Sequence, residues 1–198
     1  KTGGSVTGYT HRIVIVRDPR DWLISGMLFS IREKPEIYNN PQRLNKILTA
    51  FRQKETDPSQ VRVMSILRMI FGQETIGSIA GLLENYREAE MQMTEHYVFR
   101  YEALVKQKFS GLSHILGFDV REVPKMPLAH SHVPRTSASG DWRNWFLPED
   151  LEELLPLFSS YMSHYGYDPN EKPSEKPSIP AEHSSAYVER ILEGRISR

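Results

Sequence analysis

The chain has no cysteine among its 198 residues, and this excludes disulfides, thiolate catalysis and cysteine-ligated metal. It also lacks an excess of either charge, because 25 Lys and Arg residues balance 25 Asp and Glu residues. A general nucleic-acid or membrane-surface binder would show a basic excess, so we expect no nucleic-acid partner. No apolar run approaches the roughly 20 residues of a membrane span, and no signal peptide is recognisable. These absences favour a cytoplasmic protein.

The length suits one domain with a real core, or one domain followed by a tail. The composition changes at Asp168, where four prolines fall among Asn, Glu, Lys and Ser residues up to Pro180. We therefore expect a domain over residues 1–167, a solvated linker over 168–180 and a C-terminal helix or tail over 181–198. A helix over 181–196 would not be stable alone, so we expect it to dock on the domain or on a partner.

A short β-branched run from Ile13 to Val16 predicts a strand buried on both faces, as in a parallel sheet. Arg17 ends the run, and Asp18-Pro19 has the composition of a helix start, with a capping Asp and Pro at the first helical position. Arg17 would then lie at the carboxyl end of a strand, where open α/β sheets bind ligands.

Ser25 follows Arg17 by two helical turns, so both side chains can reach one anion, most plausibly a phosphate. The structural alternative is that Arg17 caps carbonyls or pairs with Asp21, while Ser25 is a small residue on a packed face.

The remaining pattern alternates helices with one further strand, Tyr97–Tyr101, and predicts an α/β fold with a mostly parallel central sheet flanked by helices. The expected helices cover residues 19–31, 41–54, 59–71, 75–92, 102–116, 147–165 and 181–196. His130 and His132 are spaced as metal ligands can be, but no further ligand cluster accompanies them. We expect no metal site.

The segment Arg17-Asp18-Pro19-Arg20-Asp21, with Ser25 eight positions after Arg17, resembles the 3′-phosphate-binding motif of the sulfotransferases. These enzymes use 3′-phosphoadenosine 5′-phosphosulfate as the sulfuryl donor. The resemblance implies that Arg17 and Ser25 hold the 3′-phosphate of the nucleotide. Tyr101-Glu102 resembles the family's Tyr-Glu segment, in which the tyrosine lies against the adenine; the alternative is a half-buried strand tyrosine.

A third segment, Arg135 to Asn144, resembles the family's loop that closes over the nucleotide, Arg-Lys-Gly-x-x-Gly-Asp-Trp-Lys-Asn. The resemblance implies that Arg135 binds the 3′-phosphate, with help from backbone amides near Gly140. Thr136 stands where lysine is common and Ser137 where the first glycine is common. Both can still donate hydrogen bonds, so we assign them to the same site.

The N-terminal residues match the family only in part. Lys1-Thr2 fits the first two positions of a Lys-Thr-His-like segment, but Gly3 stands where histidine, the catalytic base of many members, would be. The catalytic base is therefore not assigned, and Lys1 is the one candidate for a catalytic residue. Residues 1–9 have two alternative interpretations. One is a phosphate-cradling loop, although such a loop is followed by a helix and the strand that begins near Arg12 leaves no room for one. The other is a flexible terminus.

The resemblance as a whole implies a P-loop-like sulfotransferase fold whose 5′-phosphosulfate loop would lie upstream of Lys1. The implied reaction moves a sulfuryl group to a hydroxyl or amine of a small molecule or glycan, and leaves adenosine 3′,5′-bisphosphate. Two other readings stay open: a catalytically inactive nucleotide-binding or interaction module of the same fold, and a small-molecule kinase of related fold.

Overall fold

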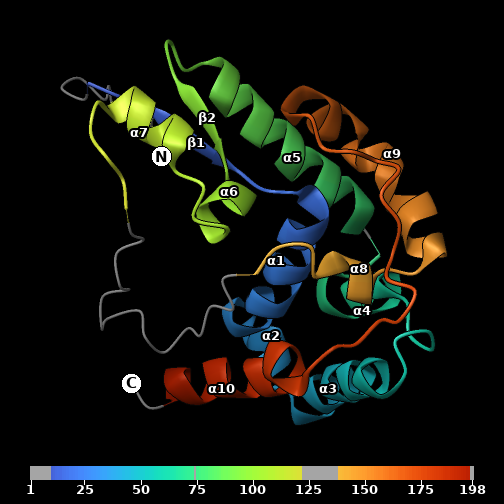
Figure 1. Ribbon diagram of the computed structural model, residues 1–198. Helices are drawn as coiled ribbons and strands as arrows, with labels where there is room; N and C mark the ends of the chain where they lie inside the picture. The colour runs from blue at the N-terminus through green and yellow to red at the C-terminus, as the bar shows by residue number, and fades with distance from the viewer. Residues whose placement is uncertain (1–9, 74, 122–137, 197–198) are drawn as a thin grey trace.

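The computed structural model describes residues 10–73, 75–121 and 138–196 (Figure 1). Of the residues assigned to the site from the sequence, Lys1, Arg135, Thr136 and Ser137 lie outside this range. The elements are β1 (Ile13–Val16), α1 (Pro19–Glu33), α2 (Pro35–Tyr38), α3 (Pro41–Thr56), α4 (Val63–Phe71), α5 (Thr75–Met91), β2 (Tyr97–Arg100), α6 (Tyr101–Val105), α7 (Ser110–Leu116), α8 (Trp142–Trp145), α9 (Pro148–Tyr165), a 3₁₀ turn (Ala181–His183) and α10 (Ser185–Ile196).

The sheet of the described chain consists of β1 and β2, which pair in parallel with Ile13 opposite Tyr97. The α/β class and the parallel pairing predicted from the sequence are therefore confirmed, but most of the described chain is helical. The prediction that the first strand is buried on both faces is wrong. Ile13 and Ile15 are 38% and 59% exposed, whereas Val16 is buried. In a sheet of two strands, β1 has a partner strand on one side only.

Helix α1 begins as its sequence predicts. The Asp18 side chain accepts a hydrogen bond from the Arg20 amide, at 2.9 Å, and Pro19 occupies the first turn. One face of α1 is apolar and buried, including Leu23, Met27 and Ile31. The helix thus runs from the end of β1 into the centre of the core.

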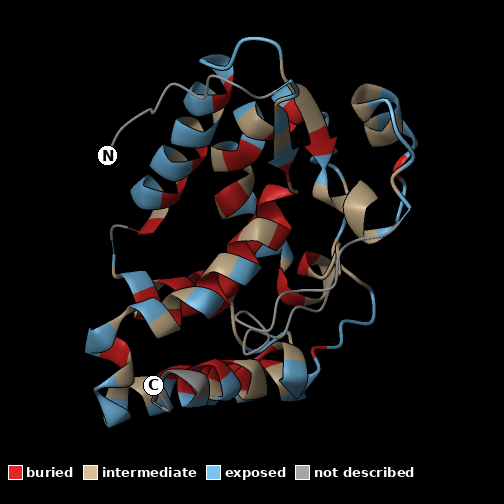
Figure 2. Cartoon of the chain, turned by 90° about the vertical axis from the view of Figure 1, so that its left-hand side faces the viewer, coloured by how far each residue is buried: buried red, intermediate tan, exposed pale blue. Residues whose placement is uncertain are grey.

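The other helices assemble around α1, with α5 packed on α9 and α10 packed on both α1 and α3. In Figure 1, α10 and α3 lie at the end of the molecule opposite the sheet. Figure 2 shows buried residues concentrated where the helices meet and exposed residues on their outer faces. The helix expected near the C-terminus is therefore a packed part of the body, and its apolar face lies against α1 and α3.

Three predicted helices have clearly different boundaries in the structure. The helix expected over 181–196 begins at Ser185, after the 3₁₀ turn. The helix expected over 102–116 is two helices, α6 and α7, because Gln107 adopts a left-handed backbone conformation with φ of 53°. The helix expected from Ser59 begins at Val63. Its first amides, those of Val63 and Met64, donate to the buried carboxylate of Asp150, at 3.1 Å each. A side chain distant in sequence therefore sets the start of α4.

Across the part of the chain that the structure describes, no single helix is both long and apolar enough to cross a membrane. Only α4 and α5 taken together reach that length and composition, and they are bent by 89°.

Candidate functional site

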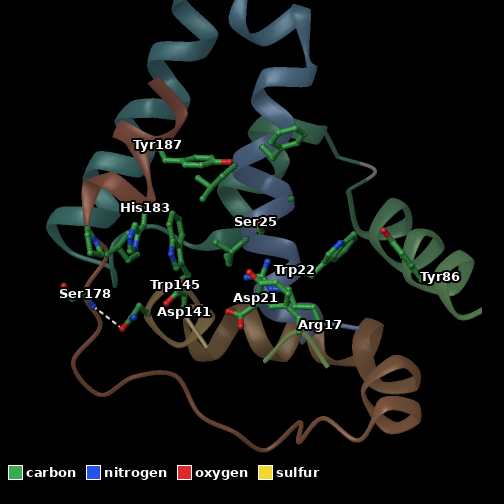
Figure 3. Close-up of a pocket in the computed structure, with 18 residues that line it drawn as sticks. Arg17, Asp21, Trp22, Ser25, Tyr86, Asp141, Trp145, Ser178, His183 and Tyr187 are labelled. Carbon is green, nitrogen blue, oxygen red and sulfur yellow. Dashed lines mark hydrogen bonds between the residues drawn. The ribbon is translucent and has the colours of Figure 1, made fainter. Parts of the chain in front are cut away.

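A cavity of about 660 Å³ opens beside the carboxyl end of β1 and along one side of α1 (Figure 3). This volume falls within the range of about 300–1,000 Å³ that is typical of small-molecule sites. Segments far apart in the sequence form the walls: α1, α5, α6, α8 and the stretch 178–187. The lining residues are Arg17, Asp21, Trp22, Ile24, Ser25, Gly26, Leu28, Phe29, Tyr86, Tyr101, Asp141, Asn144, Trp145, Ser178, Ile179, Pro180, His183 and Tyr187.

Arg17 follows β1 directly and contributes a guanidinium to this cavity. The guanidinium carbon lies 4.7 Å from the centroid of the Tyr101 ring, a cation–π geometry that orients both side chains. The buried Nε atom of Arg17 has no hydrogen-bond partner among the described residues. A buried donor without a partner is costly, so it marks a place where an anionic oxygen would be stabilised.

Ser25 lies on the same wall, two turns along α1. Its side chain is exposed toward the cavity rather than packed, and no hydrogen bond to it is formed within the described chain. The structure therefore brings Arg17, Ser25 and Tyr101 together, as the sequence predicts. The alternative of Ser25 on a packed face is not what the described chain shows.

Asp21 is 1% exposed and accepts the amides of Gly140, at 2.5 Å, and Trp142, at 3.0 Å. Burial raises the pKa of this carboxyl, while the two amides and the charge of Arg17 oppose the rise. Asp21 forms no ion pair within 4 Å of Arg17 in the described structure, so the pairing considered from the sequence is absent. Its carboxylate instead joins α1 to the start of α8.

Gly140 has a different environment from the one expected. It lines a second, neighbouring cavity of about 350 Å³, and Asp21 lies between the two cavities. Because its amide already donates to Asp21, that amide is not available to a phosphate. Its φ of +88° is a conformation that glycine adopts without strain. Gly140 therefore positions the segment next to α1, and its predicted role as a direct phosphate ligand is not what this geometry favours.

The rest of the Arg17–Asp21 motif forms a rigid frame behind the site. Arg20 is fully buried, pairs with Asp18 and Glu171 at 2.7 and 2.9 Å, and stacks on Trp142 with its guanidinium carbon 3.8 Å from the ring centroid. The Asp18 carboxylate both caps α1, by accepting the Arg20 amide, and pairs with the Arg20 guanidinium. Asp18, Arg20 and Asp21 thus fix the local structure, whereas Arg17 faces the cavity.

Sequence reasoning missed the contribution of the C-terminal stretch to this site. Ser178, Ile179, Pro180, His183 and Tyr187 line the cavity wall opposite Arg17, and we call these five residues the C-terminal wall (Figure 3). Proline-rich composition indicated a solvated linker, and no local pattern shows that its end lies beside α1. Of the two residues after Gly140, Trp142 is fully buried, while Asp141 lines the cavity.

The charge of the cavity limits what it can bind. Among its described lining residues, Arg17 is the one Lys or Arg side chain, and Asp21 and Asp141 bring two carboxylates. A phosphate dianion bound here would need a second cation close to Arg17. The sequence offers Arg135 for this role, five positions before Gly140.

No group of three or more His, Asp or Glu side chains is placed to hold a metal ion in the described parts of the chain. His130 and His132 lie outside those parts.

Comparison with known proteins does not assign the chain to a family. No protein-family model matches the chain, and no curated protein or solved structure is significantly similar to it. The α/β architecture and an arginine-bearing cavity at the end of a parallel strand are what the structure establishes.

Proposed function

We propose that this chain is a sulfotransferase with a P-loop-like fold, and that its larger cavity binds the 3′-phosphate end of 3′-phosphoadenosine 5′-phosphosulfate. One observation carries the proposal. Arg17, Ser25 and Tyr101, which the resemblance of two separate segments assigns to the nucleotide, line one cavity. Tyr101 is more than 80 positions from Arg17, so local sequence alone does not require this proximity.

The detailed contacts support an anion at this point. The unpartnered Nε of Arg17 and the hydroxyl of Ser25 supply two donors on one wall. The Tyr101 ring, held at 4.7 Å from the Arg17 guanidinium, supplies a flat surface beside them. An adenine ring stacked there would be linked through the ribose to the 3′-phosphate that Arg17 binds.

In the proposed reaction an acceptor hydroxyl or amine forms a bond to sulfur while the bond from sulfur to the bridging phosphate oxygen breaks, and the acceptor loses a proton. Arg17, Ser25 and Arg135 bind and orient the donor nucleotide in this proposal, with Thr136 and Ser137 as further donors. Lys1 remains the candidate for a reactive-end residue, and the acceptor is a small molecule or glycan.

Nucleotide binding to the full chain tests the proposal. We expect calorimetric titration to show tighter binding of adenosine 3′,5′-bisphosphate than of ATP or adenosine 5′-phosphate, because only the first carries a 3′-phosphate. Arg17→Ala and Arg135→Ala should each weaken bisphosphate binding about 10- to 100-fold, the effect of losing a charge-assisted hydrogen bond worth about 1.5–3 kcal/mol. Ser25→Ala should weaken it about fivefold.

Arg52→Ala is the matched control, since Arg52 pairs with Glu189 on the surface away from the cavity. It should leave all three affinities unchanged. Equal bisphosphate binding by the wild type and Arg17→Ala would contradict the site, and a preference for ATP would favour a kinase. Transfer of labelled sulfate to a panel of hydroxyl acceptors tests the reaction itself; nucleotide binding without transfer would favour an inactive module.

A further inference from the structure

Two short turns carry the groups that the proposed site brings together. One turn leads from β1 to α1 and contains Arg17 and Asp18, and the other leads from β2 into α6 and contains Tyr101 and Glu102. Because the strands are parallel, both turns lie at the same end of the sheet (Figure 1). The ladder of paired residues ends immediately before the two turns. Side chains therefore set how Arg17 lies relative to Tyr101.

Glu102 connects the two turns. One oxygen of its carboxylate accepts the Asp18 amide at 2.9 Å, and the other accepts the Tyr167 hydroxyl at 3.1 Å. Burial, and then the adjacent Glu102, raise the pKa of Tyr167, so its hydroxyl keeps its proton and donates. One half-buried carboxylate thus joins its own turn to the β1–α1 turn and to the segment after α9.

The Asp18 amide is a group that a neighbouring side chain commonly binds. In a capping box, the side chain at the third helical position accepts the amide of the N-cap residue. That position in α1 is Asp21, but its two oxygens accept the amides of Gly140 and Trp142. Glu102 takes the Asp18 amide instead, from 84 positions away in the sequence. A local cap would leave the two turns independent, whereas this bond couples them.

The rest of the β1–α1 turn is held in the same way. The Tyr161 hydroxyl, on α9, forms a hydrogen bond with the backbone of Arg17. Its ring lies parallel to that of Tyr167, with centroids 6.5 Å apart and 9° between the planes. Arg100, at the end of β2, lies over the Tyr167 ring at 4.9 Å. Side chains of other elements therefore fix the backbone of both residues between β1 and α1.

Glu102 is not itself placed to bind the phosphate. It lines the smaller cavity and is not among the described residues that line the larger one. Its negative charge would in any case repel a phosphate. An effect of Glu102 on phosphate binding must therefore pass through the Asp18 amide to the adjacent Arg17, whose guanidinium carbon lies 4.7 Å from the centroid of the Tyr101 ring.

We infer that Glu102 is a positioning residue: through the Asp18 amide, it holds the Arg17 guanidinium over the Tyr101 ring, where it meets an oxyanion. A displaced guanidinium loses the directed hydrogen bonds that make arginine–phosphate contacts strong. The identity of the oxyanion as a nucleotide 3′-phosphate rests on the proposed function, whereas the placement of Arg17 does not.

NMR spectroscopy of the full chain without ligand tests the placement. Protons above the face of an aromatic ring resonate upfield, so the Arg17 Nε–H and δ-methylene signals should be shifted upfield, and Tyr101→Leu should abolish that shift. Glu102→Ala should remove most of it. Glu102→Gln should retain it, because the amide oxygen still accepts the Asp18 amide. Tyr167→Phe, which removes one of the bonds that orient the carboxylate, should change the signals in the same direction as Glu102→Ala but less.

Glu153→Ala is the matched control. Glu153 is also half-buried and also accepts two partners, Arg62 and Arg68, but it belongs to neither set of described cavity-lining residues. Its loss should leave the Arg17 signals unchanged. Changes in Glu153→Ala as large as those in Glu102→Ala would show a general effect of lost stability and would overturn the inference.

Calorimetric titration measures the consequence for binding. Glu102→Ala should weaken the binding of adenosine 3′,5′-bisphosphate about fivefold, and leave unchanged that of adenosine 5′-phosphate, which lacks the group assigned to Arg17. In the Arg17→Ala background, Glu102→Ala should have no further effect, because both changes act on one guanidinium.

The two measurements separate this inference from the proposed function. Arg17 signals that move as expected, in a chain that does not prefer the bisphosphate, would support the placement and contradict the nucleotide assignment. Arg17 signals that stay unchanged in both Glu102→Ala and Tyr167→Phe would overturn the positioning role, and so would additive losses of bisphosphate affinity in the Arg17→Ala, Glu102→Ala double variant.

Discussion

At the scale of a single residue, Lys54 is the least expected side chain in the core. It lies on α3 with no exposed surface, and its ammonium donates to the carbonyls of Pro58 and Val61 at 2.8 and 2.6 Å. These bonds hold the turn that leads into α4. Burial lowers the pKa of Lys54 from 10.5 to about 8, while Asp150 and Asp57 oppose the change.

This pKa predicts a pH dependence of stability. Between about pH 8 and pH 10.5 the unfolded chain holds a proton on Lys54 that the folded chain has lost. The free energy of unfolding should therefore rise with pH across that window, by at most about 3 kcal/mol at about 1.4 kcal/mol for each pKa unit. Urea denaturation of the wild type and Lys54→Met at several pH values measures the difference.

Lys46→Met is the control, because Lys46 is on the same helix but exposed. Its unfolding free energy should follow that of the wild type over the whole pH range. A wild-type stability that falls relative to Lys54→Met between pH 8 and pH 10 would contradict the assignment.

At the scale of the elements, one carboxylate joins the starts of two helices. Asp150 is fully buried at the first turn of α9, where it accepts the amide of Leu147 at 3.1 Å. The same carboxylate accepts the amides of Val63 and Met64 at the start of α4, and Arg62 lies 3.4 Å away. The orphan amides of both helices thus depend on a single side chain.

Asp150→Ala should be among the most destabilising single changes in the chain. It leaves three amides without their acceptor and removes one of the two carboxylates beside Arg62, a loss of about 3–5 kcal/mol. Asp150→Asn keeps one acceptor oxygen and should cost less, about 1–3 kcal/mol. Glu149→Ala, one position earlier and exposed, should change the unfolding free energy by less than about 0.5 kcal/mol. Equal stabilities of the Asp150 and Glu149 variants would refute the shared cap.

At the scale of the whole molecule, α10 connects the C-terminus to the core. Val188 and Ile191 have no exposed surface, and α10 packs on α1 and α3. We therefore expect the helix to unfold together with the body rather than as a separate unit, even though a proline-rich stretch precedes it.

Ile191→Ala should lower the free energy of unfolding of the whole chain by about 2–4 kcal/mol, the usual cost of removing a buried Ile side chain. The exposed neighbour Arg190→Ala should change it by less than about 0.5 kcal/mol. Both variants should show one cooperative transition, by circular dichroism and by tryptophan fluorescence alike. An early, separate transition confined to Ile191→Ala would show that α10 is an independent tail.

The features that the sequence predicted well are those that neighbouring residues determine. Asp18 and Pro19 start α1 through a local cap, and Gly166 ends α9 in the left-handed conformation that its position requires. The pairing of Arg17 with Tyr101 on one cavity was also within reach, because both follow strands and parallel strands end at the same edge.

The features that the sequence did not predict depend on distant residues. The exposure of Ile15 depends on how many strands the sheet has, and the start of α4 depends on Asp150. Gln107 breaks a helix without any glycine or proline to indicate it. The C-terminal wall reaches the cavity only because α10 packs on α1, and the amide of Gly140 is occupied only because Asp21 lies beside it.

The two-stranded sheet also has a consequence for the order of folding. Its strands are joined by a long stretch of mostly helical chain, and the bond from the Asp18 amide to Glu102 spans 84 positions. Closing so long a loop costs on the order of 4 kcal/mol of chain entropy, whereas the intervening helices form from local contacts within microseconds. The parallel pair should therefore form late. Since Arg17 and Tyr101 directly follow its two strands, the cavity comes into existence only at the final stage of folding, and ligand binding can serve as a probe of that stage.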